Sequence, residues 1–136
     1  MDKLLQMMGL ARRANLLLAG EEVVADAIAA HKARLVLLAA DASERTGKKI
    51  RQMAGETLPV LVLPAEKDAL GAALGKGSCA VAAVLDGGFA AKLAQMLAQS
   101  NPDYVAVAER LNQKEAKRQR RKKEKPRIRK KSWGRG

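Results

Sequence analysis

The side chains with the clearest chemical meaning in this sequence are the Lys and Arg residues near its C-terminus. Residues 110–136 carry 14 Lys and Arg against two acidic residues, whereas residues 1–109 carry 12 of each sign and are neutral. Positive charge at this density displaces counterions from a nucleic-acid backbone. Trp133 could stack on an unpaired base. The expected contacts are the basic side chains of this segment and its tryptophan: Lys117, Arg118, Arg120, Arg121, Lys122, Lys123, Arg127, Arg129, Lys130, Lys131 and Trp133.

Two other interpretations of the basic segment are a nonspecific solubilising tail and a membrane-surface anchor. Beyond Lys114 almost no apolar residue is present, so the segment has no apolar face to insert into a bilayer. A solubilising tail stays open as an alternative, but nucleic acid is favoured. The segment alone does not distinguish RNA from DNA.

The sequence supplies few residues for catalysis. His31 is the one histidine, and near the end of an expected helix it fits an ordinary helix C-terminal position better than an acid–base role. Cys79 is the one cysteine, which excludes an internal disulfide and a cysteine-based zinc site. Leu70–Gly77 looks like a phosphate-binding loop, but its glycine spacing is one residue short and no Ser or Thr follows Lys76. We therefore expect no enzyme activity, no cofactor and no metal.

The same features bear on location. A lone cysteine fits a reducing compartment, and the N-terminal Met-Asp-Lys-Leu-Leu lacks the features of a secretory signal. No stretch approaches the apolar length that spans a bilayer. The expected location is the cytoplasm, with no membrane partner, and we expect a monomer.

Helices and strands that alternate along the chain are expected to position the polar residues. Periodic apolar residues and caps predict helices at 2–14, from Glu21 onward, at 43–55, at 66–74 and at 89–99. Short apolar runs predict strands at 16–18, 33–40, 60–63 and 79–85. This alternation implies helices on both faces of a central sheet, which is a single α/β/α sandwich.

Local signals refine these elements. Asp41 and Ser43 are cap candidates for the helix at 43–55, and Gly75 is expected to end the helix at 66–74. Asp86-Gly87-Gly88 is expected to make the turn into the helix at 89–99. The helix at 43–55 is basic on one face through its four Lys and Arg residues: Arg45, Lys48, Lys49 and Arg51.

The chain is expected to divide into a domain at 1–100 and a basic tail at 101–136. Tyr104, Val107 and Leu111 give the start of the tail a brief apolar stripe. No core can hold the rest, so we expect it to be helical only in part, and disordered after Pro126 unless a partner orders it.

Several segments occur in an order and spacing that are together typical of one protein superfamily. They are Gly9–Ala14, Gly20–Glu22, Leu35–Ser43, Leu70–Lys76, Ala80–Leu85 and Gly88–Ala90. Over about residues 3–98 the chain resembles the ribosomal protein L7Ae superfamily of kink-turn RNA-binding proteins, and within it the small bacterial YlxQ-like members. The resemblance implies a three-layer α/β/α sandwich around a four-stranded mixed sheet. It also implies noncatalytic binding of structured RNA, ribosomal or ribosome-associated, at one edge of the domain.

In this superfamily the RNA meets the N-terminus of the second helix and the loop before the last strand. Helix N-terminal N–H groups contact phosphate, while side chains read the exposed edges of sheared guanine–adenine pairs. Carried over by position, the implied RNA-binding residues are Gly20, Glu21, Glu22, Val23, Asp26, the turn from Asp41 to Ser43, Lys67, Gly75, Lys76, Gly77 and Ser78.

Three of these positions depart from the pattern of the superfamily. Glu22 stands where strong kink-turn binders have Asn or Lys, Val23 where they have Glu or Gln, and Asp26 where they have Lys. A carboxylate can accept guanine N–H bonds, but Asp26 near phosphates is repulsive by roughly 1 kcal/mol at surface dielectric. Glu21 and Glu22 also have a simple interpretation as acidic support for the positive end of a helix dipole. The basic tail would then supply compensating attraction.

Two other functions stay open beside RNA binding by this fold. One is a protein-interaction adaptor on the ribosome or transcription machinery, with only nonspecific RNA affinity from the tail. The other is an RNA-binding fragment of the kind fused to methyltransferases, although these 136 residues contain no catalytic domain.

Overall fold

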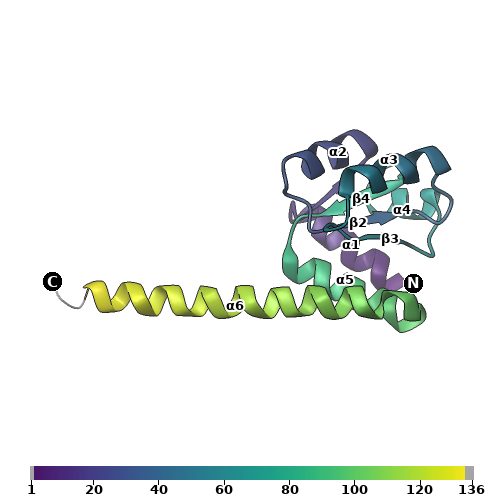
Figure 1. The fold of residues 1–136 in the computed structure, drawn as a ribbon. Coiled ribbons are helices and arrows are strands. Elements are labelled where there is room, and N and C mark those ends of the chain that lie inside the picture. The colour runs from purple at the N-terminus through teal and green to yellow at the C-terminus, as the bar shows by residue number, and fades with distance from the viewer. Residues whose placement is uncertain (1, 134–136) are drawn as a thin grey trace.

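A body of helices around a sheet carries one long helix that extends well beyond it (Figure 1). This computed structural model describes residues 2–133, with side chains described for residues 3–121. The strands are β1 (Leu17–Ala19), β2 (Leu35–Leu38), β3 (Val60–Val62) and β4 (Val81–Val84). The helices are α1 (Asp2–Arg13), α2 (Glu21–Ala29), α3 (Glu44–Ala54), α4 (Lys67–Ala73), α5 (Gly87–Ser100) and α6 (Val105–Trp133), with the 3₁₀ helix η1 (Pro102–Tyr104) before α6.

The four strands form one mixed sheet in the order β1-β4-β2-β3. Strand β4 is antiparallel to both β1 and β2, and β3 is parallel to β2. The ends of β1, β2 and β3 therefore lie at the same end of the sheet as the start of β4, which we call the entry end. The opposite end, where the chain leaves β4, is the exit end.

Apolar side chains cover both faces of the sheet, because successive residues of a strand point to opposite faces. Val36 packs in a cluster with Val24 of α2 and Ile50 of α3. Leu37 packs on the other face, in a cluster with Met8 of α1 and Leu93 of α5. These two clusters confirm the predicted three-layer α/β/α sandwich with a four-stranded mixed sheet.

Of three side chains that cap helices, one acts as expected, and two, Asp41 and Asp86, differ from the expected arrangement. Ser43 caps α3 as predicted, because its Oγ accepts a hydrogen bond from the Thr46 N–H at 3.1 Å. Asp41 instead accepts from the Lys67 N–H at 2.7 Å and so caps α4, whose own N-cap residue provides no side-chain bond. Asp86 accepts from the Phe89 N–H at 2.9 Å, so α5 begins at Gly87 and the two glycines belong to its first turn rather than to a preceding loop.

The chain after α5 begins by packing on the body. Tyr104 covers the outer edge of β3, where its hydroxyl accepts from the Val62 N–H at 2.9 Å. Ala108 and Leu111 are buried in the same cluster as α1 and α5. The start of α6 is therefore held by apolar contacts, with a hydrogen bond at the preceding η1.

Helix α6 then continues to Trp133, which differs from the expectation of partial helix and of disorder after Pro126. Between Val105 and Lys125 the sequence has no Gly or Pro, and its Lys, Arg, Gln, Glu and Ala residues have good helix propensity. Among the described residues, no helix combines the length and the apolar character needed to cross a membrane.

The loop between α4 and β4 lies directly against α4. Gly75 has φ 75° and ends the helix as predicted, with the Lys76 N–H donating to the Gly71 carbonyl at 2.7 Å. A Cβ on Gly71 would lie 2.7 Å from Ser78 Cα and 2.8 Å from Ser78 N. The absence of a side chain at Gly71 therefore lets the loop lie against α4.

The substitution Gly71→Ala tests this close approach. Because the clash is with backbone atoms, we expect a loss of about 1–3 kcal/mol in the free energy of unfolding, measured by urea denaturation. Gly77→Ala is the matched control, because a Cβ there meets nothing within 4 Å. Equal unfolding midpoints for the two variants would contradict the account.

Candidate functional site

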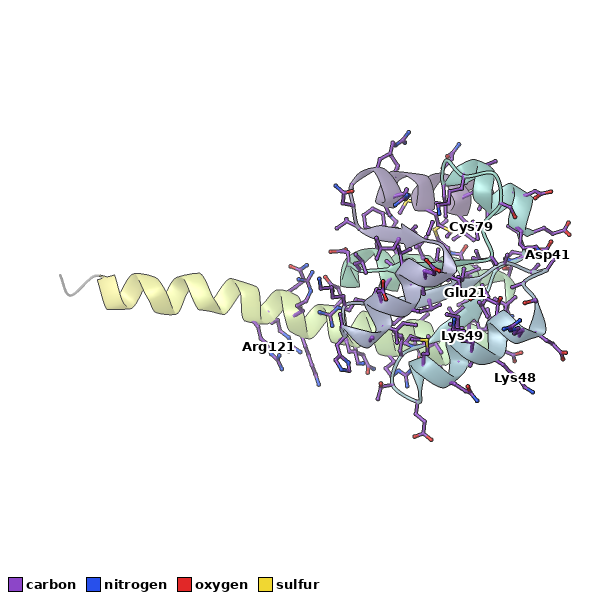
Figure 2. The ribbon with its side chains drawn as sticks, turned by 90° about the horizontal axis from the view of Figure 1, so that it is seen from above. Glu21, Asp41, Lys48, Lys49, Cys79 and Arg121 are labelled. Atoms are coloured by element: carbon purple, nitrogen blue, oxygen red, sulfur yellow. The ribbon has the colours of Figure 1, made fainter. Side chains whose placement is uncertain are left out.

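The entry end of the sheet gathers the polar residues of the body that the sequence singles out. Gly20 follows β1, Asp41 and Ser43 follow β2, and residues 75–78 precede β4. The Asp41 bond brings the start of α4, and with it Lys67, to the same end. Figure 2, seen from above, shows Glu21 near the middle of the body and Asp41 at its edge, on the side opposite to the projecting part of α6.

The N-terminus of α2 is the centre of this region. Its N-cap residue is Gly20, which has φ 117° and no side chain to bond the first N–H groups of the helix. The Gly20 N–H itself donates to the Val81 carbonyl at 3.0 Å, which ties this point to β4. A Cβ on Gly20 would lie 3.2 Å from Lys76 Nζ, so the ammonium group sits beside the helix terminus. Helix N–H groups and an adjacent ammonium can together hold a phosphate or another anion.

Glu21 is held by the neighbouring helix. Its Oε1 accepts from Thr46 Oγ1 at 2.8 Å, and its Oε2 lies 3.4 Å from Lys49 Nζ. The hydrogen bond from Thr46, followed by that from Lys49, lowers the pKa of Glu21 below its ordinary value. Ser43 Oγ also donates to Thr46 Oγ1 at 3.0 Å, so these contacts join the N-termini of α2 and α3. Figure 2 shows Glu21 and Lys49 close together between the two helices.

Sequence reasoning missed the structural role of Thr46 and Lys49. Both lie on the helix whose basic face the sequence reveals, and that face was the available signal. Their partner Glu21 is 25 and 28 residues away in sequence, so the pairing depends on the packing of α2 against α3.

The exposed side of α2 carries the three departures from the superfamily pattern. Glu22 and Asp26 are exposed carboxylates on this helix, and Val23 is 42% exposed between them. This side of α2 therefore offers hydrogen-bond acceptors and an apolar contact, while positive charge at the helix terminus comes from Lys76.

The tail residues lie elsewhere. Lys117, Arg118, Arg120 and Arg121 are on α6, and three of them line a groove at the exit end with Arg34. Within the described side chains the structure does not bring them to the N-terminus of α2. The remaining predicted tail contacts lie outside the described side chains: Lys122, Lys123, Arg127, Arg129, Lys130, Lys131 and Trp133.

The residues considered for catalysis occupy unremarkable positions. His31 is exposed and follows α2 with φ 58°. Cys79 is 4% exposed, its thiol donates to the Val81 carbonyl at 3.2 Å, and burial raises the pKa of the thiol. Across the described part of the chain, no group of three or more His, Cys, Asp and Glu residues could hold a metal ion. The chemistry that the entry end offers is the binding of an anion and of hydrogen-bond donors.

Comparisons with known proteins concern the body of the chain. Residues 2–94 match the model of the ribosomal protein L7Ae/L30e/S12e/Gadd45 family. The RNA-binding protein YlxQ of Bacillus subtilis (strain 168) is 37% identical over 91 residues, which cover 67% of this chain and 91% of that protein.

Two solved structures resemble the body. A Bacillus halodurans protein of unknown function is 41% identical, with a TM-score of 0.65 over 70% of this chain and 96% of its own. The Giardia lamblia 15.5kD RNA binding protein is 20% identical, with a TM-score of 0.57 over 68% and 82% of the two chains. The second resemblance concerns the fold alone.

The contacts of Glu21 predict a pH dependence of stability. Because the pKa of Glu21 is lowered in the folded protein, its contribution is present above its ordinary pKa of about 4.5 and is lost as the pH falls through the lowered value. We expect Glu21→Gln to flatten the loss of stability in this acidic range, measured by urea denaturation at a series of pH values. Glu22→Gln, which removes an exposed carboxylate from the same turn, is the control. A Glu21→Gln profile parallel to that of the wild type would contradict the assigned contacts.

Proposed function

Since the chain belongs to the ribosomal protein L7Ae/L30e/S12e/Gadd45 family, we propose that it binds structured RNA and catalyses no reaction on it. The name of the Bacillus subtilis relative, an RNA-binding protein, supports this proposal. The match spans 91% of that relative, so most of its sequence has a counterpart here.

One observation carries the proposal, which is the pairing of the α2 N-terminus with Lys76. The glycine N-cap leaves the first N–H groups of α2 without a side-chain partner, and Lys76 Nζ is 3.2 Å from the position of a Gly20 Cβ. A phosphate at this point would accept from the helix and from the ammonium together. Lys67 and residues 75–78 would extend the contact along the RNA backbone.

The finer part of the proposal is a preference for kinked RNA, with a ribosomal or ribosome-associated target in the cytoplasm. A kink opens base edges that a regular duplex hides, and the exposed carboxylates of Glu22 and Asp26 can accept guanine N–H bonds there. Their charge opposes phosphate, so we propose that the basic tail supplies the sequence-independent part of the affinity.

A second candidate function is an adaptor that docks on a protein through the same helix. The exposure of Val23, flanked by acidic residues at the place of an implied RNA contact, favours this alternative. An adaptor would show no preference among RNAs at the entry end.

The substitution Lys76→Ala in the full-length protein tests the proposal. Binding of a kinked RNA and of a straight duplex of equal length is measured by fluorescence anisotropy over a range of salt concentrations. For the kinked RNA we expect a loss of about five- to tenfold, corresponding to about 1–1.4 kcal/mol, and a decrease of about 1 in the salt slope. Lys92→Ala, on the exposed side of α5, is the matched control.

The duplex separates the two candidate functions. If RNA binds through the entry end, Lys76→Ala should weaken binding of the kinked RNA more than binding of the duplex. Equal losses for the two RNAs, or none for either, would refute a shape-reading site and favour the adaptor.

A further inference from the structure

A groove of about 580 Å³ lies at the exit end of the sheet, opposite the α2 N-terminus. One wall comes from the body, through the segments that enter β2 and β3 and the last turn of α3. The other wall is α6 between Leu111 and Arg121. The family match ends at residue 94, so this wall is an addition to the matched domain.

The rim of the groove is strongly positive. Its cationic side chains are Arg34, Lys114, Lys117, Arg118 and Arg121. The Arg34 backbone N–H donates to the Val84 carbonyl at 2.7 Å, so a hydrogen bond holds the backbone of this arginine to the sheet. Arg34 stands on the body and Arg121 on α6, so the positive charge comes from both walls.

Among the described residues that line the groove, Glu115 is the one acidic residue, and its carboxylate contacts neighbouring residues. Its Oε1 lies 2.9 Å from Arg118 Nη2, and its side chain is 16% exposed. A Cβ on Gly87 would lie 2.6 Å from Glu115 Oε2, so the carboxylate sits on the first turn of α5. Glu115 thus lies against the body and neutralises one arginine. It leaves the rim positive.

The floor of the groove is apolar. Ile28, Leu58 and Leu111 contribute to it, together with Met53, which is 38% exposed. An apolar floor beneath a cationic rim matches unpaired nucleotides, whose bases can lie on the floor while their phosphates reach the rim. A duplex keeps its bases stacked inside, so its phosphates could contact the cationic rim but no base would cover Met53.

We propose that this groove binds an unpaired RNA segment that flanks the structured element held at the entry end. The proposal rests on the proposed RNA-binding function, and it assigns the second contact to the junction of α6 with the body. Arg34 and Lys117 hold the phosphates from opposite walls, and Met53 lies beneath a base.

The experiment compares a kinked RNA with the same RNA carrying an unpaired extension of about eight uridines, a length within known single-strand site sizes. Both are titrated with the full-length protein by fluorescence anisotropy. We expect the extension to tighten binding about tenfold, and to raise the salt slope by about 0.7 for each phosphate contacted. Arg34→Glu should reduce the gain to about twofold or less, since it reverses a charge on the rim.

Lys92→Glu is the matched control, because it makes the same charge change at an exposed residue that does not line the groove. If Arg34→Glu and Lys92→Glu reduce the gain equally, the groove is not the site. A double-stranded extension of equal length that gives the same gain also overturns the proposal. Normal binding of the unextended RNA without any gain refutes the groove alone, whereas failure to bind the unextended RNA refutes the proposed function itself.

Discussion

The antiparallel pairing of β4 with both β1 and β2 is the constraint on which the rest of the structure depends. It sets Val84 opposite Leu17 on one side and Leu35 on the other, and β2 and β4 are buried on both faces. Because of these directions, the turn after β1 and the loop before β4 meet at the entry end. The segments that enter β2 and β3 meet the chain leaving β4 at the exit end. A hydrogen bond from the Gly20 N–H to Val81 then places the N-terminus of α2 beside Lys76.

The sequence was sufficient for the layers but not for the contacts between them. Buried aliphatic runs such as Leu35–Leu38 predicted the strands, and Ser43 and Gly75 predicted the end points of two helices correctly. Asp41 was assigned to the wrong helix, because a carboxylate in a turn can cap any helix start within reach and only the fold decides which. The close approach at Gly71 was hidden for the same reason, because only the fold brings the backbone of Ser78 against α4.

The charge distribution separates two contributions to the proposed RNA binding. The body is neutral, and its exposed α2 surface is partly acidic, so the entry end depends on oriented N–H groups and on Lys76. The excess positive charge belongs to α6, which begins in the core and then leaves the body. Glu115 lies against Gly87, and Arg34 lines the same groove as α6. These residues are too distant in sequence for their proximity to be predicted.

The central claim is that the N-terminus of α2 and the loop before β4 form an RNA-binding surface. Backbone amide NMR spectra of the isotope-labelled full-length protein, titrated with a kinked RNA without an extension, test it most directly. The uncapped N–H groups of α2 would then bond to phosphate. The account predicts the largest shift changes at the amides of residues 20–23 and 75–78. Shift changes confined to α6, with these amides unmoved, would contradict it.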